Sequence, residues 1–201
     1  MPNVHDLGAI NIKHGVCGFT STLYALDELR PKSKPLLAEA AKDARTRLMA
    51  EIKTFLVIMK AQGKQGILDE IVELTQTFKG YENWTIDGYI NKINSAARPS
   101  GVATPEINFS IAMPPNPLME YLHTVWEFNP VIENSLADHA GSAILGLTRT
   151  GGPKNRFKDL AHYVYKTKSG KLMSWGEEFT DLAALNIAKG KDYSVVYRIS
   201  L

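Results

Sequence analysis

The chain has one cysteine, no long apolar run and almost no net charge. A single cysteine cannot form an intramolecular disulfide, which excludes a disulfide-stabilised secreted scaffold. The 23 lysines and arginines are balanced by 21 acidic residues, so the formal charge is +2 and no nucleic-acid partner is expected. Apolar stretches such as Phe55–Met59 are far shorter than the roughly 20 residues that cross a bilayer, so no membrane partner is expected either.

Targeting and cofactor signals are also missing. Residues 1–15 lack the basic and apolar regions of a signal peptide, so export, if it occurs, should not involve a cleaved signal. Alternatively, the chain is the excised end of a longer protein. The five histidines and one cysteine are too scattered for a zinc site, and the TRTGG stretch lacks the spacing of a phosphate-binding loop. We therefore expect no metal and no cofactor.

The sequence predicts an α+β fold in which most helices precede most strands. Apolar residues at helical spacing, with caps and breakers, predict helices over 16–29, 35–61 and 67–78, a helix capped by Thr85, and later helices over 118–128 and 177–188. Strands are expected over 103–117, 142–149, 161–166, 171–175 and 193–199, with Ser169-Gly170 as a hairpin turn. A length of 201 residues suits one domain, with a helical lobe over about 1–97 and a sheet-rich lobe over about 98–201.

The only cysteine, Cys17, lies in the stretch HGVCGFTSTLYAL at the predicted start of the first long helix. Unpaired N–H groups and the helix dipole at such a position favour the thiolate and lower a thiol pKa. The alternative is that Cys17 is a small buried apolar residue, as most free cysteines are.

A nucleophilic thiol needs a base, and His162 is the best-placed histidine because it begins a predicted strand, which would fix its ring. A two-residue turn at Ser169-Gly170 would bring Glu177 opposite His162, with Ser174 on the approach. The remaining histidines lie in less favourable settings: His5, His14, His123 and His139.

Two short segments resemble the papain-like cysteine peptidases. GVCGFTSTLYAL is similar to the helix that carries their catalytic cysteine, and HYVYKTKSGKLMSWGEEF is similar to their histidine strand, return hairpin and Asn-Ser-Trp-Gly segment. The resemblance implies a papain-like fold with Cys17 as nucleophile, His162 as base and Trp175 over the imidazole. It also implies that Asn11, six residues before Cys17, replaces the family's glutamine at the oxyanion.

The chain departs from this family at Met173, which stands where the family has the asparagine that orients the histidine. Methionine cannot make that hydrogen bond. Ser174, Glu177 or Asp181 would have to replace it, or the dyad acts alone.

The resemblance implies a cysteine protease that cleaves a protein substrate. Small size and the absence of a signal and of disulfides favour a bacterial context. The resemblance then implies a toxin or effector, as compact bacterial papain-like domains often are, that secretion machinery delivers into the cytoplasm of a target cell. Such a toxin would have an immunity protein as partner. The alternatives are a glutamine deamidase, a peptidoglycan amidase or an acyltransferase with the same dyad, and a non-catalytic interaction protein with a buried Cys17.

Overall fold

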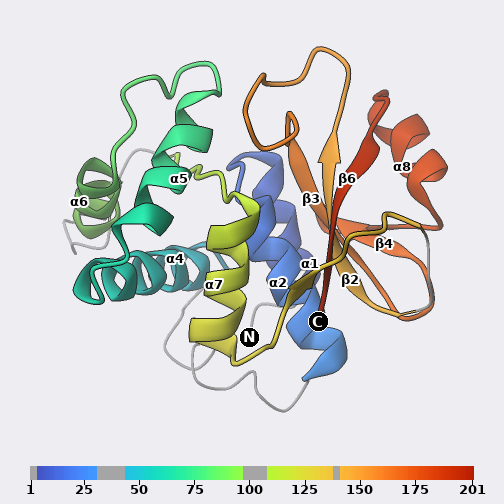
Figure 1. The fold of residues 1–201 in the computed structure, drawn as a ribbon, viewed down its shortest axis with the longest axis horizontal. Helices are drawn as coiled ribbons and strands as arrows, with labels where there is room; N and C mark the ends of the chain where they lie inside the picture. The colour runs from blue at the N-terminus through green and yellow to red at the C-terminus, as the bar shows by residue number, and fades with distance from the viewer. Residues whose placement is uncertain (1–3, 31–43, 97–107, 138–140) are drawn as a thin grey trace.

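The computed structural model describes residues 4–30, 44–96, 108–137 and 141–201. Helices form one side of the described chain and an antiparallel sheet forms the other, which confirms the α+β class (Figure 1). The helices are α1 (Val4–Ala9), the 3-10 helix η1 (Ile10–Ile12), α2 (Cys17–Leu29), α4 (Ala44–Ala61), α5 (Gln65–Gln76), α6 (Ile86–Ala96), α7 (Pro115–Trp126) and α8 (Leu182–Lys189). The strands are β1 (Val131–Ile132), β2 (Ala143–Thr148), β3 (His162–Lys166), β4 (Leu172–Ser174), β5 (Glu177–Phe179) and β6 (Ser194–Ser200).

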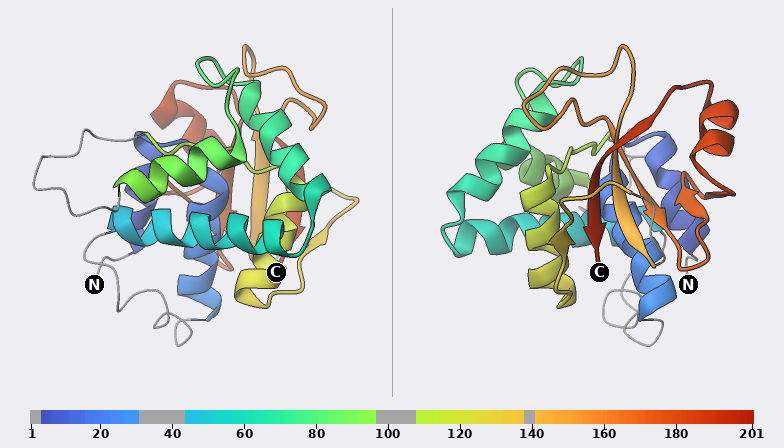
Figure 2. Two further views of the ribbon diagram at one scale, coloured as in Figure 1. Left: turned by 90° about the vertical axis from the view of Figure 1, so that its left-hand side faces the viewer. Right: turned by 45° about the vertical axis from the view of Figure 1, so that its right-hand side comes forward.

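The sheet has the order β1-β6-β2-β3-β4-β5, and every pair is antiparallel. Helix α2 lies in the middle of the molecule, between the sheet and the helices α4 to α7, while α8 lies beyond the sheet (Figures 1 and 2). Helix α2 contacts β3, β4 and β2 on one side and α7 on the other. The start of α2 is therefore held between both halves of the fold.

Helix α2 is central because nearly every one of its side chains is apolar or small. Its residues from 18 to 26 are all buried. A helix that is apolar on all sides is stable only inside a protein. Its last turn ends at Leu29, before the Arg30-Pro31 step, as the sequence predicts.

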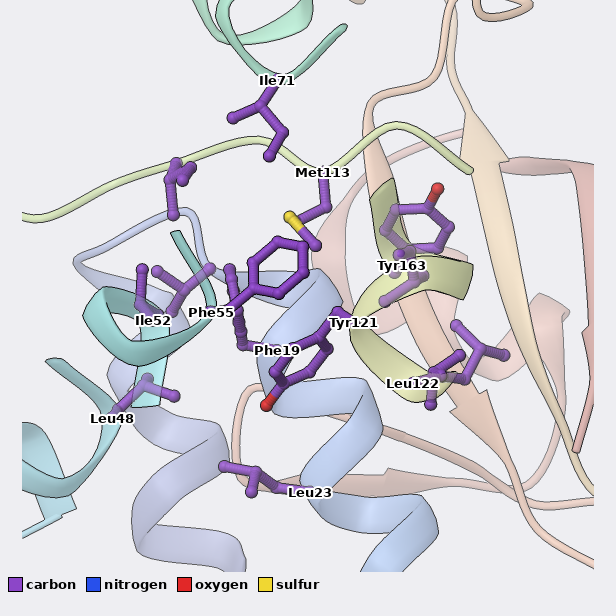
Figure 3. Close-up of a cluster of buried hydrophobic side chains, with 14 of the residues drawn as sticks. Phe19, Leu23, Leu48, Ile52, Phe55, Ile71, Met113, Tyr121, Leu122 and Tyr163 are labelled. Atoms are coloured by element: carbon purple, nitrogen blue, oxygen red, sulfur yellow. The ribbon is translucent and has the colours of Figure 1, made fainter. Parts of the chain in front are cut away.

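The larger core joins α2 to the helical side. Phe19 of α2 meets Tyr121 of α7 edge to face at 4.7 Å between ring centroids, and Phe55 of α4 meets Tyr121 at 5.3 Å (Figure 3). All three side chains are fully buried. Edge-to-face aromatic pairs of this kind add to the free energy of area burial.

A second core lies on the other face of the sheet, under α8. Leu145 and Leu147 of β2, Val164 of β3 and Leu185 of α8 form it. Because side chains alternate along a strand, His162 shares this face with Val164, while Tyr163 and Tyr165 face the larger core.

The strand predicted over 103–117 is wrong for its described residues, because residues 108–114 are irregular and α7 begins at Pro115. Residues 108–114 form no strand, because their polar groups bond outside the sheet: Ile111 N–H donates to Gly15 O, and Ala112 N–H donates to Thr75 Oγ1. Residues 103–107 and 35–43, also placed in predicted elements, lie outside the described residues.

The helix predicted over 177–188 begins later. Residues 177–179 pair with β4 as strand β5, and Asp181 then caps α8 by accepting a hydrogen bond from Ala184 N–H at 2.8 Å. The cap residue, not the apolar periodicity, sets the start of the helix. The predicted stop at Gly190 is confirmed, since this residue caps α8 in the left-handed conformation.

Candidate active site

The N-terminus of α2 lies against the first residues of β3. The Cys17 thiol is hydrogen-bonded by the backbone of Tyr163, the residue after His162. Asn11 fixes the turn before α2, because its Oδ1 accepts a hydrogen bond from Val16 N–H at 2.8 Å. Two segments far apart in the sequence, around Cys17 and Tyr163, thus lie side by side where a dyad is predicted.

Cys17 and His162 line the same pocket, whose cavity volume is about 60 Å³. Its walls come from the end of α5, the 110–113 segment and the residues that lead into β3. Most of the lining is apolar: Leu74, Phe78, Ile111, Ala112, Met113, Leu160 and Ala161. The pocket therefore lies at the junction of the helices and the sheet.

The His162 ring is held by a hydrogen bond and by stacking. Its Nε2 lies 2.8 Å from Ser174 Oγ, and the Trp175 indole stacks on it with a centroid distance of 4.0 Å and an interplanar angle of 5°. Met173 pairs with Tyr165, so the next residue, Ser174, shares the sheet face of His162. Ser174 therefore fixes one ring nitrogen, Nε2.

Trp175 is held in place by a strained turn. Its φ is +52°, and the next residue, Gly176, has a φ of +81°. Gly176 N–H donates to the Tyr24 hydroxyl of α2 at 2.9 Å, and a Cβ at Gly176 would lie 2.8 Å from His5 O. Positive φ at both central residues is what a two-residue type I′ hairpin turn requires. Glycine adopts this conformation freely, whereas at Trp175 it costs free energy that the surrounding contacts offset.

Of the three groups proposed to replace the family's asparagine, the structure brings only Ser174 to His162 by a hydrogen bond. Glu177 pairs instead with Lys189, whose Nζ lies 2.9 Å from both carboxylate oxygens. Asp181 caps α8, and Met173 packs in the larger core. The predicted place of Glu177 opposite His162 is wrong, because β4 turns directly into β5 after Gly176.

The other histidines of the described chain lie in different surroundings. His14 stacks on Phe109 at 4.1 Å, and His5 Nδ1 lies 3.1 Å from Gly176 O. His123 lines a separate surface pocket on α7, and His139 lies outside the described residues.

Burial overrides the expected effect of the helix N-terminus on Cys17. Desolvation raises the pKa of the Cys17 thiol to about 11, although hydrogen bonds from Tyr163, Gly18 and its own backbone favour the thiolate. Desolvation, with a smaller contribution from the Lys189 charge, lowers the pKa of His162 to about 3. The expectation of a lowered thiol pKa is wrong in this structure, and the resting pair is a neutral thiol and a neutral imidazole.

The pH dependence of alkylation checks this assignment. The rate of Cys17 modification by iodoacetamide is expected to keep rising through pH 9 toward the thiol pKa of about 11, because only the thiolate reacts. Near-ultraviolet circular dichroism at each pH confirms that the fold persists. A rate that reaches its plateau below pH 8 would instead indicate a stable thiolate–imidazolium pair.

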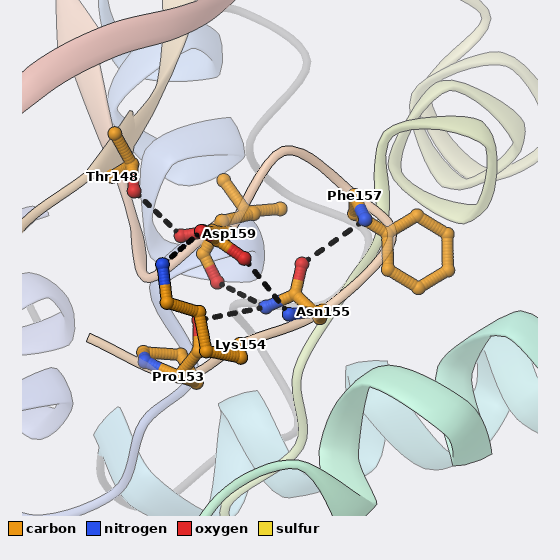
Figure 4. A network of polar contacts seen from close by, with 7 residues as sticks. Thr148, Pro153, Lys154, Asn155, Phe157 and Asp159 are labelled. Atoms are coloured by element: carbon orange, nitrogen blue, oxygen red, sulfur yellow. Dashed lines mark hydrogen bonds and ion pairs between the residues drawn. The ribbon is translucent and has the colours of Figure 1, made fainter. Parts of the chain in front are cut away.

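A polar network orders the loop that leads into β3 (Figure 4). Asn155 Nδ2 donates to Leu160 O at 3.2 Å, and Asn155 N–H donates to Asp159 Oδ1 at 3.0 Å. Thr148 Oγ1 of β2 donates to Asp159 O at 2.8 Å. Lys158 and Asp159 both have φ near +54°, so the network holds a strained backbone directly before His162.

This loop is also tied to the helical side. Arg156 Nε lies 2.6 Å from Glu73 Oε1, and Arg156 Nη2 lies 3.9 Å from Glu70 Oε1, both on α5. A run of Asn, Asp, Lys and Arg before a strand histidine is the one signal of this network in the sequence.

The Ser174 contact can be tested by removing one oxygen atom. Ser174→Ala is expected to lower the rate of any Cys17-dependent reaction by up to about a hundredfold, the effect of a misplaced catalytic group. Ser169→Ala is the matched control, since Ser169 is exposed at the tip of the preceding hairpin. Equal rates in the two variants would show that Ser174 does not orient the ring.

The chain matches no protein-family model, no curated protein and no solved structure. Among the described residues, no group of three His, Cys, Asp or Glu side chains could hold a metal ion. No helix of the described chain is long and apolar enough to cross a membrane.

Proposed function

We propose that this protein is a papain-like cysteine hydrolase in which Cys17 is the nucleophile and His162 is the base. The observation that supports this most strongly is that the residues Cys17 and His162 line one pocket while Ser174 and Trp175 hold the imidazole.

The neutral resting pair leads to a general-base mechanism. His162 Nδ1 accepts the Cys17 proton as the sulfur attacks the amide carbonyl, and the carbonyl oxygen becomes an oxyanion. The backbone N–H of Cys17 and the Asn11 side chain are the proposed oxyanion donors; because Asn11 Oδ1 is already engaged by Val16, its Nδ2 would donate. The imidazolium then protonates the departing amine, and the acyl group stays on sulfur.

Water completes the cycle. His162 takes a proton from water as it attacks the thioester carbonyl, and the tetrahedral intermediate expels the Cys17 thiolate. The proton returns from His162 to sulfur, which restores the neutral pair. Ser174 keeps the imidazole in one orientation throughout.

A peptide bond of a protein is the substrate that fits best. The pocket beside Cys17 is largely apolar, and it could receive one aliphatic or aromatic side chain next to the scissile bond. A peptidoglycan amidase, by contrast, would need a groove lined by polar groups for its sugars.

New protein termini identify the reaction. We expect that a cell extract incubated with the wild-type protein gains peptide N-termini that Cys17→Ser does not produce. A glutamine deamidase would instead convert glutamine to glutamate without cleavage, and an amidase would release peptides from purified peptidoglycan. No Cys17-dependent product in any of the three assays would favour a non-catalytic interaction protein.

We further propose that the protein acts as a bacterial toxin or effector in the cytoplasm of a target cell, where a cognate immunity protein would neutralise it. This rests on the proposed hydrolase and on the small size of the chain. Expression in the cytoplasm of a bacterium is expected to stop growth for the wild type and not for Cys17→Ala. Equal toxicity of the two would contradict the proposal.

A further inference from the structure

Lys189, the last residue of α8, lies against the aromatic group that stacks on the candidate base. Its Nζ is 4.9 Å from the centroid of the Trp175 ring and 5.3 Å from that of Phe179. Both carboxylate oxygens of Glu177 hold the same ammonium at 2.9 Å. The Lys189 side chain is only 23% exposed, so this cation is partly desolvated.

The contacts connect Lys189 to His162 through one indole. Trp175 is stacked on the imidazole at 4.0 Å and lies under the Lys189 ammonium. A cation over an indole is attracted by the ring quadrupole, most strongly where water is excluded. Loss of the ammonium would therefore loosen the ring that covers His162.

Lys189 also supplies a positive charge that acts on His162 from the far side of this contact. The neutral groups that face the ring are Ser174 from β4, Trp175 from the following turn and Tyr193 before β6 at 5.9 Å, while Cys17 lines the same pocket as His162.

The other charged groups in this region have partners of their own. Glu177 is engaged by Lys189, and Asp192 accepts a hydrogen bond from Thr150 N–H, while Arg149 lies near Tyr193. A positive charge beside an imidazole opposes its protonation.

We propose that Lys189 is a positioning residue of the active site: through Trp175 it holds the His162 ring, and its charge keeps that ring in the proton-accepting form in acidic surroundings. This inference rests on the proposed hydrolase. It predicts an enzyme that still works when the surrounding pH falls well below neutral. The low pKa of His162, to which the Lys189 charge contributes, supports the argument from geometry.

A purely structural role for Lys189 predicts something different. The Glu177 side chain is half exposed, and an ion pair with such a partner contributes at most about 1 kcal/mol to the free energy of unfolding. Loss of that pair alone would slightly lower the unfolding temperature and leave the pH profile unchanged. The pH profile therefore separates the two roles.

The test compares Lys189→Met, which keeps the apolar stem, with Lys189→Arg, which keeps the charge. The acid limb of kcat/KM is expected to move upward by about one pH unit in Lys189→Met, the effect of one charge several ångströms away at intermediate dielectric. Lys189→Arg should stay near the wild type. Glu177→Gln, which leaves the ammonium unbalanced, should not move the limb upward.

Two measurements on the intact chain can be made without any catalytic assay. One is the NMR titration of the His162 ring in a Cys17→Ser background, assigned with His162→Gln. The other is the pH dependence of the free energy of unfolding. Because the unfolded imidazole binds a proton near pH 6.5 and the folded one near pH 3, stability falls as the pH drops between these values.

In both measurements Lys189→Met should raise the folded pKa of His162 and so shorten the pH range over which stability falls. Identical titrations and identical unfolding profiles for Lys189→Met and the wild type would overturn the inference. If His162 responds as expected but no Cys17-dependent hydrolysis is found, the proposed function fails and the role of Lys189 in setting the state of His162 stands.

Discussion

Cys17→Ala is expected to lower the rate of peptide-bond hydrolysis by at least about a thousandfold while leaving the fold intact. The reaction has no other thiol to use, because the chain contains one cysteine. The stability should change little, since the substitution removes one sulfur atom from a half-buried site on the pocket wall. The measurement is the initial rate of cleavage of a protein found as substrate in the terminus assay, together with the unfolding temperature.

His162→Gln is the companion variant, and it should lose activity to a similar extent because nucleophile and base act as a unit. Thr20→Val is a suitable control, since Thr20 lies one turn further along α2 and is buried. Residual activity above about a tenth of the wild-type rate in Cys17→Ala would show that the thiol is not the nucleophile.

Phe55→Ala should have the largest effect on stability, a loss of about 3–5 kcal/mol in the free energy of unfolding. Phe55 is fully buried and packs edge to face against both Phe19 and Tyr121. Its removal would leave a cavity where α2, α4 and α7 meet (Figure 3). Because domains are stable by only about 5–15 kcal/mol, a large fraction of the molecules could unfold.

Val57→Ala is the matched control on the same helix, two residues along. Val57 is 44% exposed, so the expected loss is within about 0.5 kcal/mol. Urea unfolding of both variants gives the comparison. Similar losses in the two variants would show that the three aromatic rings do not form the main contact between α2 and the other helices.

The sequence predicts the two elements that carry the candidate dyad because their signals are local. The small and apolar residues after Cys17 define a buried helix, and the aromatic and β-branched residues after His162 define a strand. Their convergence follows from the pairing of α2 with β3, which periodicity alone does not specify. The expectation that they converge came from the resemblance of two short segments to the papain-like peptidases, not from the periodicity.

The partner of His162 was only partly predictable. Ser174 was one of three candidates, and the choice among them depends on the register of two consecutive hairpins. The sequence does not reveal that Glu177 pairs with Lys189, because a surface ion pair leaves no periodic pattern. Its bond to Lys189 explains why an acid so near the site is not the orienting group.

The protonation states could not be predicted at all. A helix N-terminus is visible in the sequence and favours a thiolate, but the degree of burial of Cys17 and His162 depends on the whole fold. Desolvation decides the direction of the pKa shift for both groups here. The same limitation applies to the loop before β3, whose strained residues are held by contacts with β2 and α5.

The meeting of α2 with β3 has a consequence for the timing of activity. Cys17 leaves the ribosome before His162. A chain still in synthesis therefore holds the proposed nucleophile without its proposed base. Contacts between such distant segments form slowly, because loop closure must precede them. In the proposed mechanism a partly made chain is therefore inert, and hydrolysis would begin only after β3 and β4 have joined the sheet.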